Sequence, residues 1–320
     1  MNRKIEWLSI LQGWSMLLVV IGHVTLTNIF NDPATPFSSA VERIIYSFHM
    51  PLFMVISGYL FYYTKISRNE KYYKTIFSKL KRLGIPFCFF TFSTFLLKFI
   101  FNPMMRRPVE LSFDQIVNCF LYPSSNPLGE MWFIATLLFI FLFYPIFKWS
   151  LQVKWRVLTV AGITIALNLF FPAGITLFCI SQIAYYLVFF YIGILLCKYQ
   201  YINKLPVGIW GLVFILFNVV YPLPLITPFV GVMFSIGLCQ WLAKFAPRLF
   251  ASFRNFTFQI FLMGIFFQIG MRFLYLKLQI DTLYWPMYFA SILIALYIPV
   301  AISKLILRLN NKFLNQFFGL

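Results

Sequence analysis

Charged side chains are scarce in this chain. Only 11% of its 320 residues are Asp, Glu, Lys or Arg, and only 8 are acidic. Soluble domains carry about 25% charged residues, so this composition excludes a soluble globular enzyme and a disordered chain. The 5 cysteines are scattered without metal-ligand spacing, so we expect neither a disulfide framework nor a metal centre. What is abundant is apolar: 61% of the residues are hydrophobic, and 42 of them are Phe.

The apolar residues form runs long enough to cross a membrane. A bilayer core about 30 Å thick needs about 20 such residues per helix. The runs are continuous rather than alternating, which disfavours a β-barrel. We expect an all-α polytopic integral membrane protein with about ten transmembrane helices in a single domain, residues 1–320, plus an interfacial helix over 111–122. The ten predicted spans cover residues 8–28, 44–64, 83–101, 131–147, 157–172, 174–196, 206–222, 226–243, 256–275 and 284–305.

The positive residues predict the orientation. If the N-terminus is cytoplasmic, twenty of the 26 Lys and Arg residues fall in segments on the inner side. The positive-inside rule then predicts ten spans with both termini cytoplasmic, in the inner (cell) membrane. The net charge of +18 is therefore a record of topology, and we expect no nucleic-acid partner. Residues 1–23 have the basic start of a signal peptide but no small-residue cleavage site, so we interpret them as an uncleaved first span.

Both histidines lie inside predicted spans, where ionisable groups cost about 2.5–3.5 kcal/mol on insertion scales. His23 is expected about five residues before the outer end of the first span, and His49 about five residues into the second. The two imidazoles are therefore predicted to share one layer. The simpler interpretation is that each is a neutral histidine hydrogen-bonded within the bundle. Two histidines at one depth favour a functional site.

His49 opens a longer run that continues through Pro51 to Phe61. Pro51 removes a backbone donor and is expected to kink the helix. Ser57 and Gly58 permit close packing or a polar lining, and Tyr59 follows them. An ordinary kinked helix is the alternative interpretation of this run.

Residues 65–82 carry seven positive charges, ending in Lys81 and Arg82. One interpretation is topology combined with contact to anionic membrane lipids. The other is capture of a polyanionic cytosolic ligand, because the arginine fork matches phosphate geometry. At the opposite face, Glu130 and Trp132 open the fourth predicted span. Glu130 is expected either to orient a histidine or to be a solvated residue at a helix N-terminus.

Several of these segments together resemble the acyltransferase-3 family of membrane O-acyltransferases, which includes fucose 4-O-acetylase-like and O-antigen acetylases. The resemblance follows chain order over most of the sequence and is strongest in residues 10–90. The first-span histidine and the His-Met-Pro-Leu-Phe…Ile-Ser-Gly-Tyr-Leu run carry most of its specificity. The segments that carry it are Gly13–His23, Phe48–Phe61, Lys81–Phe87, Met131–Phe133 and Tyr191–Leu195.

The resemblance implies an enzyme of about ten helices that takes an acyl group, commonly acetyl, from cytosolic acyl-CoA. It delivers the group to a sugar hydroxyl, often of a cell-surface glycan or a lipid-linked precursor. His23 matches the family's essential first-span histidine, Arg82 matches a basic position on the acyl-CoA side, and His49 and Ser57 match the second-span motif. The sequence departs from the family at Gln12, where Arg or Lys is usual, and in having no late histidine.

Our hypothesis from these residues assigns His23 as general base and His49 as the group that orients substrate or contacts the oxyanion. Ser57, Tyr59 and Trp132 would line the acyl path, while Arg82 and Lys81 would hold the CoA phosphates. Acyl-CoA acts as a co-substrate, and no tightly bound cofactor is expected. Two alternatives stay open: a ten-helix transporter or exporter of a polysaccharide or small molecule with proton-relaying histidines, and a degenerate acyltransferase acting as a scaffold.

Overall fold

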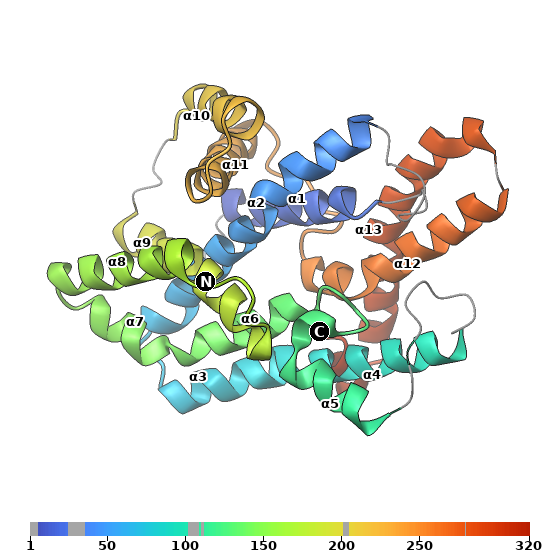
Figure 1. Cartoon of the computed structure of the whole chain (residues 1–320), viewed down its shortest axis with the longest axis horizontal. Helices are drawn as coiled ribbons and strands as arrows, with labels where there is room; N and C mark the ends of the chain where they lie inside the picture. Colours follow the sequence, from blue (N-terminus) through green and yellow to red (C-terminus); the bar gives the residue numbers. More distant parts are fainter. Residues whose placement is uncertain (1–5, 25–35, 102–108, 110–111, 201–204, 279) are drawn as a thin grey trace. The chain divides into compact units, whose positions relative to one another are not determined.

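The computed structural model describes residues 6–24, 36–101, 109, 112–200, 205–278 and 280–320 (Figure 1). Within these ranges every regular element is a helix, which confirms the all-α class predicted from the apolar runs. The α-helices are α1 (Glu6–Gly22), α2 (Pro36–Phe61), α3 (Tyr72–Lys79), α4 (Ile85–Ile100), α5 (Phe113–Leu121), α6 (Met131–Leu142), α7 (Tyr144–Ser150), α8 (Lys154–Phe170), α9 (Ile180–Tyr199), α10 (Val207–Ile215), α11 (Ile226–Phe245), α12 (Thr257–Leu278), α13 (Tyr284–Arg308) and α14 (Lys312–Phe317).

Shorter π and 3-10 segments join several of these helices. The π segments are η1 (Tyr62–Ile66), η2 (Leu80–Gly84) and η6 (Leu216–Val220). The 3-10 segments are η4 (Pro123–Ser125), η5 (Leu177–Cys179) and η7 (Asp281–Leu283). π segments interrupt α-helices mostly in single turns and are frequent at functional sites. Here η1 and η2 bracket the basic stretch that the sequence marks as a candidate anion site.

Six helical stretches in the described part of the chain are long and apolar enough to cross a membrane. A seventh is possible if α6 and α7, which meet at a bend of 52°, form one span. Two further apolar helices, over Glu6–Gly22 and Val207–Asn218, are shorter. The structure thus supports a polytopic membrane protein, while the count of ten spans and the orientation of the termini stay predictions. The six stretches are Phe37–Ile66, Tyr72–Ile100, Leu177–Tyr199, Ile226–Phe245, Thr257–Leu278 and Asp281–Arg308.

Two predicted boundaries near the histidines are wrong. The first predicted span runs to residue 28, but α1 ends at Gly22, and residues 25–28 lie outside the described part of the chain. The second predicted span begins at residue 44, but α2 begins at Pro36. Its first two turns mix apolar residues with Ser38, Ser39, Glu42 and Arg43, so hydropathy alone gives little reason to include them. Proline is favoured in the first turn of a helix, which explains the earlier start.

The fourth predicted span, residues 131–147, is interrupted. α6 ends at Leu142, Phe143 leaves helical geometry with ψ of 8°, and α7 starts with Pro145 in its first turn. The interfacial helix expected over 111–122 is confirmed as a helix, because α5 covers Phe113–Leu121. Ser112 caps it by accepting a hydrogen bond from the Gln115 backbone N–H.

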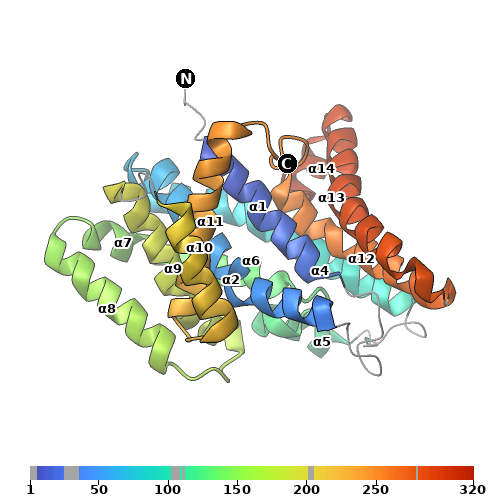
Figure 2. The ribbon, with the colours of Figure 1, turned by 90° about the horizontal axis from the view of Figure 1, so that it is seen from above.

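The described chain divides into two compact units. Unit 1 contains residues 1–56, 200–311 and 320, and thus α1, most of α2 and α10–α13. In it α1 packs on α11, α12 and α13, and α12 and α13 run side by side, as Figures 1 and 2 show. Gly231 of α11 lies directly against the Phe48 ring of α2. The core of unit 1 is aliphatic, with Ile10, Leu52 and Leu262 fully buried.

Unit 2 contains residues 57–199 and 312–319, and thus the last turn of α2, α3–α9 and α14. Its core is aromatic. The fully buried Phe61 ring lies 4.9 Å from the Phe141 ring centroid and 5.5 Å from that of Tyr144. The Tyr144 hydroxyl donates a 2.7 Å hydrogen bond to the Glu70 carbonyl, which ties α7 to the segment that follows η1.

Candidate active site

Unit 1 brings the two histidines together. The imidazole centroids of His23 and His49 are 6.4 Å apart, with the rings at 81°. The prediction that the two imidazoles share one layer is therefore confirmed as a contact. His49 is buried, with 2% of its surface exposed, whereas His23 is half-buried. His23 is thus the more accessible member of the pair.

Each imidazole is oriented by its own helix. Nδ1 of His23 lies 2.7 Å from the Val19 carbonyl oxygen, and Nδ1 of His49 lies 2.9 Å from that of Ile45. A carbonyl oxygen only accepts hydrogen bonds, so Nδ1 carries the proton in both rings. In the neutral form each Nε2 then presents a lone pair. This tautomer fits a base at His23, and it suits His49 to accept from a substrate hydroxyl rather than to donate to an oxyanion.

His23 sits at the end of α1, not five residues inside it as the sequence predicts. The last four carbonyls of a helix have no partner within it. Here the backbone N–H of His23 donates to Val19, and that of Val24 donates to Ile21. Gln268 of α12 donates a 2.7 Å hydrogen bond from Nε2 to a third of these carbonyls, that of Val20. The turn that carries His23 is thus held by both backbone and side-chain donors.

His49 also differs in position, lying thirteen residues after the start of α2 rather than five. The longer helix adds a third ring to the pair. Tyr46 lies one turn before His49, with ring centroids 4.8 Å from His49 and 5.6 Å from His23. Sequence reasoning missed Tyr46, although the Tyr-x-x-His spacing places both side chains on one helix face.

Gln268 is the second residue that the sequence interpretation missed. It is a buried side chain, 5% exposed, in an otherwise apolar stretch of α12. A polar residue in a membrane helix calls for a partner, and that signal was present in the sequence. The predicted site was built from ionisable side chains within spans and from segments that resemble the family, and Gln268 belongs to neither group.

Gln12 lies about three turns before His23, on the same side of α1. It is half-buried, and its backbone carbonyl accepts a 2.9 Å hydrogen bond from Ser15. The start of α1 is anchored by an ion pair between Glu6 and the buried Arg254, whose atoms are 2.6 Å apart. Trp14 adds a 3.3 Å hydrogen bond to Ser235 of α11. The helix that carries Gln12 and His23 is therefore fixed along its whole length.

The basic residues belong to unit 2. Lys81 and Arg82 are exposed and lie in the π segment η2. Lys79, one turn earlier, is half-buried, and its ammonium lies 4.4 Å from the Phe141 ring centroid and 5.7 Å from that of Phe61. An ammonium over an aromatic face is attracted by the ring quadrupole. The segment therefore offers two accessible cations and a third held against the aromatic core.

Glu70 is the acidic member of this stretch. Lys65 donates hydrogen bonds of 2.8 and 3.0 Å to its two carboxylate oxygens. These bonds are the main reason why the pKa of Glu70 lies below its ordinary value, with smaller help from the positive charge of Lys65 and Lys74. The pair leaves the remaining cations of the stretch in excess.

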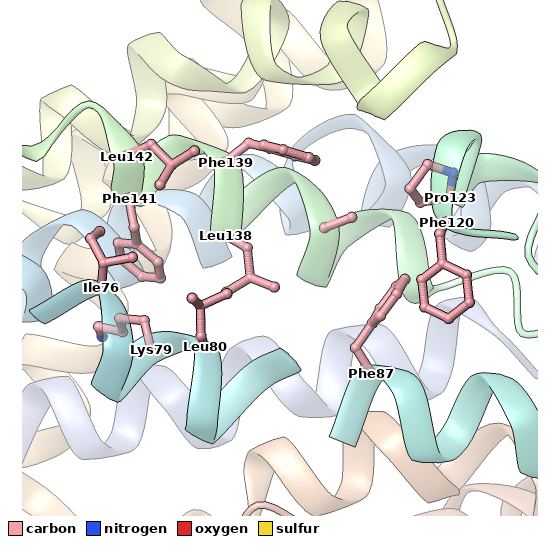
Figure 3. Close-up of a pocket in the computed structure, with 11 residues that line it drawn as sticks. Ile76, Lys79, Leu80, Phe87, Phe120, Pro123, Leu138, Phe139, Phe141 and Leu142 are labelled. Carbon is pink, nitrogen blue, oxygen red and sulfur yellow. The ribbon is translucent and has the colours of Figure 1, made fainter. Parts of the chain in front are cut away.

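A pocket opens beside Lys79, with a volume of about 180 Å³ (Figure 3). Figure 3 shows Lys79, Ile76 and Phe141 at one end and Phe87, Phe120 and Pro123 at the other. All the other lining side chains are apolar, so the Lys79 ammonium is its single charged group. The pocket suits an apolar chain that bears a negative charge at one end.

The second-span motif enters unit 2 at Ser57. Ser57 and Tyr59 are half-buried, and Gly58 between them is buried. A Cβ at Gly58 would overlap the backbone carbonyl of Phe190, so only glycine permits this approach of α2 to α9. The close packing allowed for by the sequence is therefore confirmed. Tyr59 forms a side-chain hydrogen bond with Cys197 of α9.

Glu130 and Trp132 lie at the start of α6. Glu130 is half-buried at the N-cap position, where its backbone carbonyl accepts from Phe133 at 3.0 Å. This placement matches the interpretation of Glu130 as a helix N-terminal residue, while a role at the histidines stays a prediction. The Trp132 ring stacks on Tyr186 of α9, with centroids 5.5 Å apart at 24°.

Comparison with known proteins gives the class. A family model described as an acyltransferase domain matches residues 5–304, nearly the whole chain. The chain therefore belongs to the acyltransferase-3 family, and its recognition from the sequence is confirmed. The family is one of acyltransferases, and the described part of the chain has helices long and apolar enough to span a membrane.

Among individual proteins, the chain is similar to nodulation protein NolL of Sinorhizobium fredii (strain NBRC 101917 / NGR234). The two are 30% identical over 198 residues, which is 62% of this chain. The match covers only 50% of the relative, so the chain spans about half the length of that protein. No solved structure matches the chain.

Proposed function

We propose that this protein is a membrane O-acyltransferase that transfers an acyl group, expected to be acetyl, from acyl-CoA to a sugar hydroxyl. The acceptor would be a cell-surface glycan or its lipid-linked precursor. The observation that carries the proposal is the contact between His23 and His49 in a chain of the acyltransferase-3 family. An imidazole with a lone pair at Nε2 is the group that such a transfer needs as a base.

In the proposed reaction, Nε2 of His23 takes the proton of the sugar hydroxyl as its oxygen attacks the thioester carbonyl carbon. The tetrahedral intermediate collapses, the carbon–sulfur bond breaks, and the CoA thiolate receives the proton from the His23 imidazolium. The products are the sugar ester and free CoA. The hydrogen bond from Nδ1 to Val19 supports this role, because it fixes the tautomer with Nε2 as acceptor.

His49 is proposed to position the substrate. Its own Nδ1 bond to Ile45 leaves Nε2 to accept from the same or a neighbouring hydroxyl. Tyr46 packs against both imidazoles and would hold the rings in their relative orientation. General-base catalysis of this kind contributes about 10²–10⁴-fold to a rate.

We propose that the donor is held by unit 2. Arg82 and Lys81 are exposed cations that suit the CoA phosphates, and Arg82 offers a planar fork for two oxygens. The adjoining pocket beside Lys79 suits the apolar part of a thioester. Ser57, Tyr59 and Trp132 are proposed to line the acyl path. Gln12 and Glu130 complete the set of proposed substrate-binding residues, Gln12 as an uncharged substitute for the family's basic residue and Glu130 as a carboxylate at the start of α6.

The remaining expectations follow from the same proposal. The chain would be a multi-pass protein of the inner membrane, with ten spans, both termini cytoplasmic and one domain over residues 1–320. Its partners would be acyl-CoA, a glycan or lipid-linked saccharide, and membrane lipids. Labelling of single cysteines introduced before residue 6 and after residue 311 in intact cells tests the position of the termini, and both are expected to be inaccessible from outside.

Membrane fractions incubated with radiolabelled acetyl-CoA and total envelope glycan test the reaction. The wild-type chain is expected to transfer label to glycan, and His23→Ala to lose about 10²–10⁴-fold of the rate. Ser47→Ala is the matched control, because Ser47 lies on the same turn of α2 as His49 but bonds to Asn218. Unchanged glycan labelling in His23→Ala would falsify the general-base assignment.

A further inference from the structure

A polar cavity in unit 2 lies between α8 and α9. It has a volume of about 280 Å³ and carries no charged lining residue. Its wall combines two side-chain amides, Asn168 and Gln182, with the rings of Tyr185 and Tyr186. We call this set the α8–α9 pocket. A ligand that fits it is uncharged and has both a polar edge and an apolar face.

The oxygens of the two amides indicate which hydrogen-bonding groups a ligand of this pocket would carry. Oδ1 of Asn168 and Oε1 of Gln182 are buried and accept no hydrogen bond from any residue that the structure describes. The Asn168 amide nitrogen is already used, because it donates a 2.7 Å bond to the Tyr185 carbonyl, and this bond fixes which side of the amide carries the oxygen. Buried acceptors are almost always paired in proteins. Two orphaned acceptors beside one cavity therefore call for a ligand that brings donors.

The pocket wall is held in place independently of any ligand. The Ser181 hydroxyl donates to the Pro172 carbonyl at 2.7 Å and accepts from the Ile175 backbone N–H at 3.0 Å. These bonds hold the loop of Pro172 and Ile175 against the first turn of α9. Tyr186 is backed by Trp132, which stacks on its ring. The aromatic wall is therefore rigid and presents an apolar surface.

We propose that the α8–α9 pocket binds one ring of a neutral saccharide. Sugar hydroxyls are donors that would satisfy Asn168 and Gln182, and the C–H face of a pyranose packs against an aromatic ring. The volume of about 280 Å³ is just below the range of drug-sized ligand pockets, about 300–1,000 Å³, and fits a single ring rather than a chain. That the bound sugar is the acyl acceptor rests on the function proposed above, whereas the binding itself does not.

A larger cavity of about 350 Å³ in the same unit offers a comparison. It is lined by the amides of Gln115 and Asn118 and by Lys98. Among the described residues, none of its lining side chains has an orphaned buried atom. Asn126, its most buried amide, is paired on both sides, with Thr91 and with the Leu128 backbone N–H. This cavity therefore lacks the observation that carries the proposal and supplies the matched control.

The test measures binding of methyl α-glucoside, methyl α-mannoside and methyl α-fucoside to the full chain in lipid nanodiscs, by saturation-transfer difference NMR. Nanodiscs avoid maltoside detergents, whose head groups are saccharides. Gln182→Met keeps the side-chain volume and removes the orphaned oxygen, and Gln115→Met is the matched variant in the other cavity. We expect at least one glycoside to bind, about tenfold weaker binding in Gln182→Met, and unchanged binding in Gln115→Met.

Wild-type affinity in Gln182→Met, or a loss confined to Gln115→Met, overturns the proposal. If Gln182→Met does not fold, Asn168→Leu supplies the same comparison. Binding that depends on Gln182 without any acyl transfer to glycan keeps the saccharide site and overturns the proposed function. Acyl transfer that proceeds while no glycoside binds, and whose acceptor KM is unchanged in Gln182→Met, keeps the function and overturns the saccharide site.

Discussion

Gln268 of α12 donates a hydrogen bond of 2.7 Å to the backbone carbonyl of Val20, three residues before the candidate base His23. The bond satisfies a carbonyl that the end of α1 would leave unpaired. It also joins two helices that are 235 residues or more apart in the chain, α1 (Glu6–Gly22) and α12 (Thr257–Leu278). Gln268 therefore helps to fix the position of His23 through the backbone of α1 rather than through an imidazole ring.

Replacing Gln268 with Leu is expected to leave the Val20 carbonyl unsatisfied. The cost is about 1–3 kcal/mol of unfolding free energy, because a buried acceptor loses its partner. We also expect kcat to fall with little change in the KM for acetyl-CoA. Thermal unfolding in nanodiscs and initial rates measure the two effects. Gln259→Leu, at a second buried glutamine of α12, is the control and should lower stability without the selective fall in kcat.

Substitution of Tyr46 separates its ring from its hydroxyl. The ring packs on both imidazoles, so Tyr46→Phe is expected to keep the transfer rate. Tyr46→Ala removes the packing, which is typically worth about 0.5–1.5 kcal/mol and corresponds to a rate loss of up to about tenfold. Initial rates at saturating acetyl-CoA measure this. A large loss in Tyr46→Phe would show instead that the hydroxyl takes part.

Alanine at Gly58 is expected to separate α2 from α9. The added Cβ overlaps the Phe190 carbonyl, and backbone has little room to move, so we expect a loss of about 1–3 kcal/mol or more. Gly162→Ala in α8 is the matched control, because nothing lies within 4 Å of its Cβ. Helical propensity predicts a gain of about 0.5–1 kcal/mol there. Thermal unfolding of the two variants should therefore shift in opposite directions.

The Lys65–Glu70 pair predicts an acid-sensitive contribution to stability. The pKa of Glu70 is lowered in the folded chain, chiefly by its hydrogen bond from Lys65. Its stabilising effect is therefore complete above the ordinary carboxyl pKa and is lost as pH falls through the lowered folded pKa. Lys65→Met should flatten this part of the stability profile, measured by thermal unfolding from pH 7 downward. An equally steep acid loss in the variant would assign it to other carboxylates.

The sequence predicted the helical class and the meeting of His23 and His49 because both depend on strong local signals. Long apolar runs specify membrane helices, and counting residues along two consecutive helices of opposite direction placed both histidines at one depth. The boundaries were less predictable. α2 begins in turns that carry Ser, Glu and Arg, and α6 ends at Leu142, because proline placement and packing decide helix ends there as much as hydropathy does.

The sequence indicates that polar residues within spans need hydrogen-bond partners, but it does not identify those partners. Gln268 stands in an apolar helix far along the chain, and only the fold reveals that it meets Val20. The orphaned oxygens of Asn168 and Gln182 are likewise invisible in a sequence, because being unpaired is a property of the surroundings. Tyr46 is the exception, since its spacing from His49 within one helix was open to prediction.

Both histidine rings take their orientation from a carbonyl four residues earlier in the same helix. In each histidine the tautomer is thus set by a backbone carbonyl one turn earlier, and no carboxylate side chain is needed to set it. Side chains around the imidazoles are free to diversify without redirecting the proton. Neighbouring side chains can therefore be substituted to accept a different alcohol, while Nε2 of His23 stays unprotonated in the neutral ring and keeps its role as the proposed base.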